Sequence, residues 1–274
     1  MEYGKIGRML LSAGMFVSLL GAGRAACPEA QDARSVAMLT YNVRNGIGMD
    51  GCADCDRIAR AIRRSGADVV AVQEVDSATR RSAGRYVAGE IAEAVGMHAT
   101  FGAAIPFEGG SYGIAVLSRE RPLAVRRIAL PGREEARLLL VAEFDRYAFA
   151  CVHLSLTEED RLASVAAIRA EALRSGKPFV LAGDWNDTPG SPLFDALAEA
   201  GFRIVATPQA TFPADAPTDT IDHFALFGAE GVAAQEVRVI AEPAASDHRP
   251  VSATLRWCGV RPVPDDADRV PPMR

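Results

Sequence analysis

A series of short apolar runs, each ended by an acidic, amide or imidazole side chain, constrains this sequence more than any other feature. Runs of this kind are typical of buried strands. The polar residues that end or follow them are Asn42, Glu74, His153, Asp184 with Asn186, Asp222, and Asp247 with His248. Strand ends that meet at one rim of a sheet would gather these side chains in a small volume.

Such a cluster needs a compensating charge. Like charges repel at short range, and burying them unpaired costs several kcal/mol each. A divalent cation resolves this, since Mg²⁺ prefers a few carboxylate and amide oxygens and keeps some waters for substrate. The pattern therefore indicates a metal-binding rim.

Helical signals lie between the apolar runs. Asp54 can cap a helix that ends at Gly66. Further helices are expected over Arg85–Val95, Thr157–Arg174 and Pro192–Gly201. The predicted strands cover about Leu39–Val43, Asp68–Glu74, Ile114–Ser118, Leu123–Ala129, Leu138–Phe144, Tyr147–Leu154, Phe179–Ala182, Thr220–Phe227, Glu236–Ile240 and Val251–Trp257. Helices among many strands indicate two packed sheets with helices outside, and the four strands between residues 114 and 154 suggest an antiparallel meander.

Length and composition bound the function. The chain has 274 residues, of which 49% are hydrophobic and 24% charged. These values are ordinary for one globular domain and argue against a disordered or low-complexity chain. The formal net charge of −5 provides no basic field for holding polyanions. Any binding of nucleic acid must therefore be local.

The two ends of the chain differ in character from the middle. Lys5 and Arg8 precede the apolar run Met9–Ala22, and the small residues around Ala25 offer a cleavage site. We expect residues 1–25 to be a signal peptide and the protein to be exported, periplasmic or secreted. A lipid anchor on Cys27 and an uncleaved leader are the alternatives. Residues 259–274 are expected to form a disordered tail.

Seven ordered blocks of the sequence resemble the endonuclease/exonuclease/phosphatase superfamily, which includes pancreatic-type deoxyribonucleases, inositol-polyphosphate 5-phosphatases and neutral sphingomyelinases. The blocks are Leu39–Arg44, Val70–Val75, Tyr112–Arg119, Val152–Leu154, Gly183–Asn186, Ile221–His223 and Ser246–Pro250. The resemblance implies an α+β fold over residues 35–258, a four-layer α/β/β/α sandwich of two packed mixed sheets. It also implies divalent-metal phosphoester hydrolysis at one rim, with Mg²⁺ as the cofactor and Mn²⁺ as an alternative.

The resemblance assigns metal binding to three side chains. Glu74 is expected to hold the cation, and Asn42 to be a co-ligand or to position the metal. Asp247 is expected to be a further ligand or to support one. Without the resemblance, Asn42 would also fit a turn and Glu74 a strand-end charge facing water.

Five side chains are expected to carry the reaction. In the implied mechanism Asp184 aligns a water for attack, while Asn186, His153 and His248 stabilise the developing charge. Asp222 is a buried-looking carboxylate that can orient His248. An Asx turn is the alternative explanation for Asp184 and Asn186, and a hydrogen-bonded core position for His153.

Two further residues are expected to bind substrate, and one histidine is not. Tyr112 can hydrogen-bond a phosphate oxygen, and Arg137 matches an arginine often found near the metal carboxylates in a close subgroup. This sequence has Ile114 where that subgroup carries Asn. We expect His223 to be structural, because it follows Asp222 and faces the opposite side of its strand.

The cysteines allow both a structural and a redox interpretation. Members of this fold bring the first and last strands together, which implies a Cys27–Cys258 disulfide in an exported chain. Cys52–Cys55 is a candidate second bridge, and Cys151 is expected to be a buried free thiol. A thioredoxin-like role for Cys52 and Cys55 is the rival, but no thioredoxin-like pattern surrounds them.

The sequence leaves the phosphoester open. We expect a monomer without a stable protein partner that acts on DNA, a phospholipid or a sugar phosphate. Nuclease-like phosphodiester cleavage is the leading interpretation, and a sphingomyelinase-like phosphodiesterase or a phosphatase is the alternative. A non-catalytic protein that binds a phosphate ligand is the alternative from another class.

Overall fold

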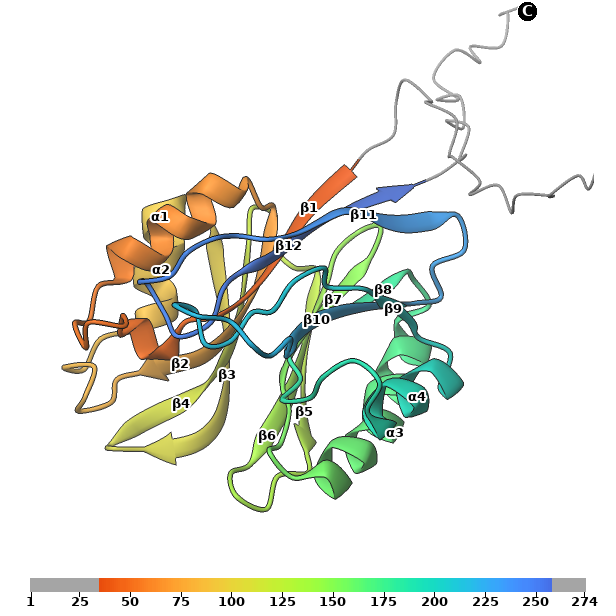
Figure 1. Ribbon diagram of the computed structural model, residues 1–274, viewed down its shortest axis with the longest axis horizontal. Coiled ribbons are helices and arrows are strands. Elements are labelled where there is room, and N and C mark those ends of the chain that lie inside the picture. The colour runs from red at the N-terminus through yellow and green to blue at the C-terminus, as the bar shows by residue number, and fades with distance from the viewer. Residues whose placement is uncertain (1–34, 258–274) are drawn as a thin grey trace, which may run out of the picture.

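Two six-stranded mixed sheets pack face to face within residues 35–257, the residues that the computed structural model describes (Figure 1). The predicted signal peptide over residues 1–25, the tail over residues 259–274, Cys27 and Cys258 lie outside the described residues. The four-layer α/β/β/α sandwich expected for the fold is confirmed.

The first sheet carries the chain's first and last described strands. Its order is β11 (Val232–Val239), β12 (Val251–Trp257), β1 (Ser35–Asn42), β2 (Val69–Ser77), β4 (Gly110–Ser118) and β3 (His98–Phe107). Helices α1 (Cys55–Ser65) and α2 (Val87–Val95) cover its outer face. In the antiparallel pair of β1 and β12, Ser35 lies opposite Arg256. Both described chain ends therefore leave the sheet at the end opposite Asn42.

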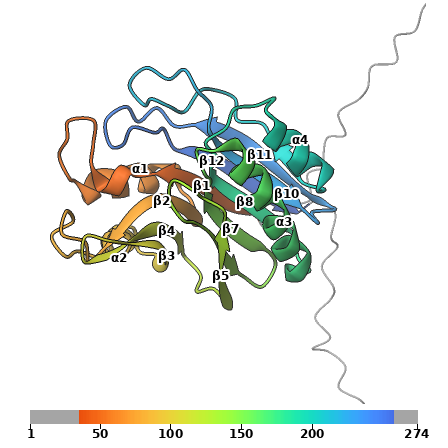
Figure 2. The same ribbon diagram turned by 90° about the horizontal axis from the view of Figure 1, so that it is seen from below.

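The second sheet has the order β5 (Ala124–Leu130), β6 (Arg137–Glu143), β7 (Ala148–His153), β8 (Phe179–Asp184), β10 (Asp222–Phe227) and β9 (Arg203–Val205). Helices α3 (Glu158–Ser175) and α4 (Pro192–Glu199) cover its outer face. The two helix pairs lie on opposite sides of the molecule in both ribbon views (Figures 1 and 2).

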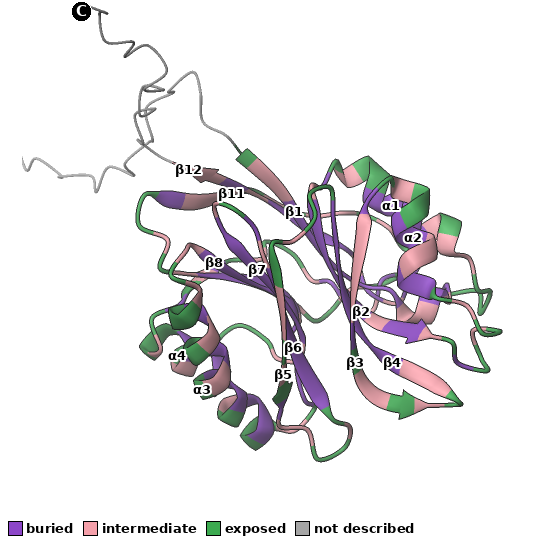
Figure 3. Cartoon of the chain, turned by 180° about the vertical axis from the view of Figure 1, so that it is seen from behind, coloured by how far each residue is buried: buried purple, intermediate pink, exposed green. Residues whose placement is uncertain are grey.

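Alternating side chains of the strands build three apolar layers. Val69 and Ala71 of β2 face the core between the sheets, while Val70 and Val72 face α1 and α2. This alternation is the consequence of the two-residue period of a strand, and it explains why the first four residues of β2, which are covered on both faces, are all apolar. Figure 3 shows buried residues along the central strands and exposed residues on the outer faces of the helices.

Local signals set the helix ends as expected. Asp54 accepts a hydrogen bond from the backbone N–H of Arg57 at 2.9 Å, and Gly66 ends α1 in the left-handed conformation. No helix within residues 35–257 combines the length and the apolar composition needed to cross a bilayer.

Three expectations need correction. Strand β4 belongs to the first sheet, so the meander comprises only β5, β6 and β7. Strands β3 and β9 were not expected, because β3 is a half-buried edge strand without clear alternation and β9 has three residues. Cys52 and Cys55 are both free thiols, whereas Cys151 is free and buried as expected.

Candidate active site

The register of the second sheet brings three of the predicted side chains together. His153 lies opposite Asp184 in the parallel pair of β7 and β8, and Asp222 lies opposite Asp184 in the antiparallel pair of β8 and β10. Residues opposite one another in a sheet carry their side chains on the same face. His153 Nε2 accordingly lies 3.5 Å from Asp184 Oδ2.

His248 joins this group from the loop that precedes β12. Its Nδ1 lies 2.9 Å from Asp222 Oδ2, and its Nε2 lies 3.7 Å from Asp184 Oδ2. The Asp222 side chain is completely buried. Its carboxylate therefore fixes the tautomer and the direction of the His248 ring, which is the pairing expected from the sequence.

The pKa values of the two imidazoles are shifted in opposite directions. Burial disfavours the charged form of His248, but the carboxylates of Asp222 and Asp184 outweigh it and raise the pKa to about 10. Burial dominates at His153 and, with the charges of Arg137 and His248, lowers the pKa to about 4 against the opposing effects of Asp184 and Glu134. At neutral pH the rim thus holds one imidazolium and one neutral imidazole.

Asn42 connects the two sheets at this rim. Its Nδ2 donates to Glu74 Oε1 and to Asp184 Oδ2, each at 3.0 Å, while its Oδ1 accepts from the backbone N–H of Arg44 at 3.1 Å. The amide therefore turns its nitrogen toward the carboxylates. Of the two roles expected for Asn42, this orientation favours positioning over ligation.

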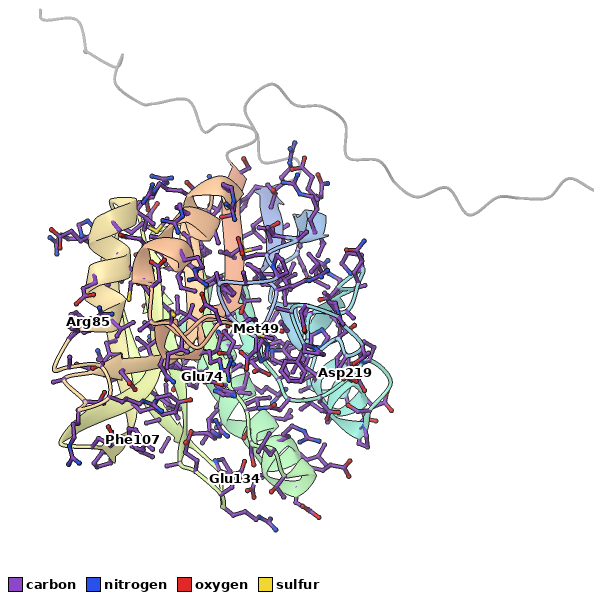
Figure 4. All side chains as sticks on the ribbon, turned by 60° about the vertical axis from the view of Figure 1, so that its left-hand side comes forward. Met49, Glu74, Arg85, Phe107, Glu134 and Asp219 are labelled. Carbon is purple, nitrogen blue, oxygen red and sulfur yellow. The ribbon has the colours of Figure 1, made fainter. Side chains whose placement is uncertain are left out.

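Glu74 projects into the site from an irregular point of β2. Its backbone is left-handed, with φ of 58°, and the pairing of β2 with β4 shifts register between Val72 and Val75. A bulge of this kind redirects a side chain that regular pleating would place elsewhere. Figure 4 labels Glu74 near the centre of the molecule, between Phe107 on one side and Asp219 on the other.

Carboxylates converge around Glu74. Burial raises the pKa of Glu74, and the charges of Asp247 and Asp184 raise it further, against the opposing effects of Asn42 and His248. Asp247 is held by Arg44, whose Nε lies 3.4 Å from its Oδ2. The oxygen donors of Glu74 and Asp247 are of the type that a hard divalent cation requires, so the donor chemistry fits Mg²⁺ or Mn²⁺.

A second candidate metal site includes His248 and the two carboxylates that face its ring. One ligand atom each of Asp184, Asp222 and His248 lie within 4.8 Å of one another. His248 Nδ1 is already committed to Asp222 in this group.

Asn186 forms the turn that follows β8. Its backbone N–H donates to Asp184 Oδ1 at 2.9 Å, and its Nδ2 donates to the Leu154 carbonyl at 2.9 Å. The Asx turn considered as an alternative is therefore present. It fixes one oxygen of Asp184, and a contact of Asn186 with substrate stays a prediction.

Tyr112 and Arg137 line a small recess together with His153, between β4 of the first sheet and β6 and β7 of the second. Arg137 is 7% exposed, and its Nη atoms lie 3.5 Å from Glu134 and 3.2 Å from Glu135. Its Nε has no hydrogen-bond partner within residues 35–257. Burial, reinforced by Glu74 and Glu135, raises the pKa of Tyr112, so the phenol keeps its proton.

His223 lies away from this cluster. It packs against Trp185 and Phe194, and its Nε2 lies 3.0 Å from the Thr220 carbonyl. The structural role expected for His223 agrees with this environment.

Two residues of the site were not singled out from the sequence. Ser246 Oγ donates to the Asn42 carbonyl at 2.7 Å and ties the loop of His248 to β1. Arg44 neutralises Asp247. Both lie inside the sequence blocks that carry the family resemblance. Their position in these blocks was the signal that could have marked them as residues of the site.

The sequence matches the model of the Endonuclease/Exonuclease/phosphatase family over residues 39–248. The chain belongs to this family of phosphoester hydrolases. A solved endonuclease/exonuclease/phosphatase from Beutenbergia cavernae DSM 12333 is 25% identical, with a TM-score of 0.65 over 82% of this chain and 72% of that one.

Two other solved structures share the fold at lower identity. A mannosyl-6-phosphatase of Bacteroides thetaiotaomicron VPI-5482 is 18% identical, with a TM-score of 0.64 over 80% of this chain and 99% of that one. The 2′,3′-cyclic phosphatase ANGEL2 is 15% identical, with a TM-score of 0.64 over 82% of this chain and 95% of that one. Comparison with curated proteins finds no match.

Proposed function

We propose that this chain is an exported, divalent-metal-dependent phosphoester hydrolase of the phosphodiesterase type. The observation that carries the proposal is the convergence of Glu74 and Asp247 with the hydrogen-bonded pair of Asp222 and His248 around Asp184. An oxygen donor set beside an oriented imidazolium suits the transfer of a phosphoryl group to water.

Glu74 and Asp247 would hold the cation, and Asn42 bridges the carboxylates of Glu74 and Asp184 by donating to both. When bound, Mg²⁺ or Mn²⁺ polarises the phosphoryl group and stabilises the leaving oxygen. We assign the group of Asp184, Asp222 and His248 to proton handling instead, because the ring of His248 is already committed to Asp222.

Asp184 is the group placed to orient the attacking water and accept its proton. Its Oδ1 is fixed by the Asn186 N–H and its Oδ2 by Asn42. The imidazolium of His248 faces the same Oδ2 at 3.7 Å and supplies positive charge where the pentavalent phosphorus gathers negative charge. Tyr112, Arg137 and neutral His153 line the adjoining recess as donors for phosphate oxygens.

Phosphodiester cleavage in DNA is the leading reaction, with a phospholipid headgroup or a sugar phosphate as the alternatives. The two low-identity neighbours, one named for mannosyl 6-phosphate and one for 2′,3′-cyclic phosphate, motivate including both ester types in a substrate panel. A protein that binds phosphate without cleaving it would retain the recess and lack turnover.

The test is release of phosphate or headgroup from DNA, sphingomyelin, inositol phosphates and sugar phosphates, and opening of a nucleoside 2′,3′-cyclic phosphate, with Mg²⁺ or Mn²⁺ and with excess chelator. We expect turnover only with cation, and loss of turnover in Glu74→Gln. The matched control is Glu93→Gln on the exposed side of α2, which should keep wild-type rates. Mg²⁺ should also raise the Tm of the wild type and of Glu93→Gln but not that of Glu74→Gln, since a ligand bound to the folded state stabilises it. Full turnover in chelator contradicts the proposal.

Export is proposed on the basic and apolar pattern of residues 5–22. N-terminal sequencing of the protein recovered outside the cytoplasm should find cleavage after Ala25. A start at Met1 in that fraction contradicts a cleaved signal peptide.

A further inference from the structure

A hollow of about 120 Å³ lies beside the candidate active site, on the side of the first sheet. Its lining includes Asn45, Asp76, Arg81 and Arg85. Asp76 follows Glu74 by two residues and lies opposite Tyr112 in the pairing of β2 with β4. The hollow therefore adjoins both the proposed metal ligands and the phosphate recess, although none of the roles assigned above uses it.

Arg81 is held at the edge of this hollow by a buried carboxylate. Its Nε and Nη2 donate to the two oxygens of Asp76 at 2.7 and 2.8 Å, and Nη2 also donates to Asn45 Oδ1 at 2.7 Å. The Asp76 side chain is completely buried and accepts a further bond from Thr79. A two-point pair of this type fixes the plane of the guanidinium.

The flat face of the same guanidinium rests on aromatic rings. Arg81 Cζ lies 4.4 Å from the ring centre of Phe107 and 5.2 Å from that of Tyr112. A cation in this position is attracted by the ring faces. The Arg81 side chain nevertheless remains 33% exposed, and its Nη1 donates no hydrogen bond within residues 35–257. The two N–H donors of Nη1 are thus left free at the edge of the hollow.

Arg85 is the second cation that lines the hollow. Asp76 cancels the charge of Arg81, whereas Arg85 is paired only with the half-buried Glu90 among residues 35–257, at 3.3 Å, and its Nη2 contacts Cys55 Sγ at 3.1 Å. Solvent-accessible ion pairs of this kind are weak. Figure 4 labels Arg85 and Phe107 on the same side of Glu74. The hollow therefore offers N–H donors and positive charge, which is the environment that an oxyanion requires.

We propose that this hollow binds a second phosphate of the substrate, distinct from the phosphate that is cleaved. The inference rests on the proposed phosphoester hydrolysis and narrows its substrate to esters that carry two phosphates, such as a nucleic-acid strand or a bisphosphorylated sugar. Tyr112 links the two positions, since its ring contacts Arg81 and its side chain lines the recess with His153. Binding of the second phosphate by Arg81 would fix the position of the first.

The first test uses two thymidine 3′-(4-nitrophenyl phosphate) esters that differ only in a 5′-phosphate. A second pair of thymidine esters carries the 4-nitrophenyl phosphate at the 5′ position, and its two members differ only in a 3′-phosphate. In the wild type we expect the added phosphate to raise kcat/KM about tenfold or more in at least one pair, equivalent to about 1.4 kcal/mol. Arg81→Gln should abolish this gain, and Arg81→Lys should keep part of it. Arg80→Gln is the matched control, because the neighbouring Arg80 is exposed and should leave the gain intact.

The outcomes separate this proposal from the proposed function. Two outcomes overturn the subsite. In the first, the gain in kcat/KM is the same in Arg81→Gln as in the wild type. In the second, the added phosphate raises kcat/KM neither in the two thymidine pairs nor between glucose 6-phosphate and glucose 1,6-bisphosphate. A gain in the glucose pair alone identifies a sugar source. If no ester is cleaved at all, the proposed hydrolysis fails. Calorimetry of thymidine 3′,5′-bisphosphate against thymidine 5′-phosphate then tests the hollow by itself, with tighter binding of the bisphosphate expected in the wild type and not in Arg81→Gln. If Arg81→Gln does not fold, Arg85→Gln takes its place.

Discussion

At the scale of single residues, the number of carboxylates around a ring sets its charge. The side chains of His153 and His248 are 11% and 6% exposed, and both face Asp184 Oδ2. Only His248 has Asp222 on its other nitrogen. This contact and the charges of Asp184 and Asp247 outweigh burial and raise the pKa of His248 to about 10, whereas burial, Arg137 and His248 lower the pKa of His153 to about 4. A rim with one charged and one neutral imidazole can stabilise negative charge and still offer a neutral hydrogen-bonding partner.

The two residues at the centre of this arrangement should control turnover. We expect Asp184→Asn and His248→Ala each to lower kcat by at least about 10²-fold, the size of effect of a positioned base or a charge-stabilising donor. Steady-state kinetics on the most active ester of the panel measures it. His223→Ala is not a suitable control because that ring is packed in the core, so His98→Ala serves. Wild-type rates in either variant contradict the mechanism.

The lowered pKa of His153 also affects stability. The unfolded chain binds a proton at this histidine at a pKa of about 6.5, whereas the folded chain does so at about 4. The unfolded state therefore holds more protons between these values, and the free energy of unfolding falls as pH drops from about 6.5 through about 4. His153→Gln should reduce this slope in urea unfolding at pH 7, 6, 5 and 4, and His98→Gln should not. An unchanged slope in His153→Gln rules out this source of acid sensitivity.

Much of the site is predictable because polar residues at the ends of apolar strands are conspicuous. The pairing of Asp222 with His248 follows from the sequence, since both lie beside apolar runs and an imidazole needs an orienting acid. The direction of the Asn42 amide is not predictable, because it depends on which carboxylates surround it in three dimensions. The contact between Asp76 and Arg81 is also hidden in the sequence, since charges in a loop usually face water.

At the scale of elements, the signals that begin and end a helix are local in the sequence. The positions of bulges and the pairing of strands are not. The caps of α1 were predictable from Asp54 and Gly66. The bulge at Glu74 depends on pairing with β4 and has no local signal. The expectation that β4 belongs to the meander assumed that consecutive strands pair. It was wrong because the chain crosses to the second sheet after Ser118. Local chemistry thus predicts where an element starts, but pairing partners require the tertiary fold.

The cap of α1 provides a quantitative test of this local control. Asp54→Ala removes the acceptor of the Arg57 N–H and should lower the free energy of unfolding by about 1 kcal/mol. Asp56→Ala, in the same first turn but without a capping bond, should lower it by only a few tenths of a kcal/mol. Urea unfolding monitored by circular dichroism measures both. Equal effects of the two substitutions would show that the helix dipole dominates over the cap.

At the scale of the whole molecule, the site exists only when the two sheets are packed together. Asn42 and Glu74 come from the first sheet, and His153, Asp184 and Asp222 come from the second. The hydrogen bond from Asn42 to Asp184 crosses between them. Two sheets with helices outside are predictable from the alternation of strands and helices. The division of strands between the sheets is not, because it depends on long-range pairing.

The expected Cys27–Cys258 disulfide is a prediction at this scale. Both cysteines lie outside residues 35–257, and the described strands that lead toward them, β1 and β12, are antiparallel neighbours. The bridge would close most of the chain and contribute about 2 to 4 kcal/mol. Non-reducing peptide mapping of the exported protein should find Cys27 joined to Cys258. A free Cys258 thiol or a lipidated Cys27 contradicts it.

The pairing of Ser35 with Arg256 has a practical consequence for handling the protein. Because the described chain enters and leaves at the end of the sheet opposite Asn42, a tag or surface tether fused directly before Ser35 or after Trp257 is attached far from the rim that holds Glu74 and Asp184. An immobilised enzyme would then present its rim to the solution. The same geometry suits circular permutation, in which a short linker joins the old ends and new ones are opened in the tight turn at Asp145 and Arg146.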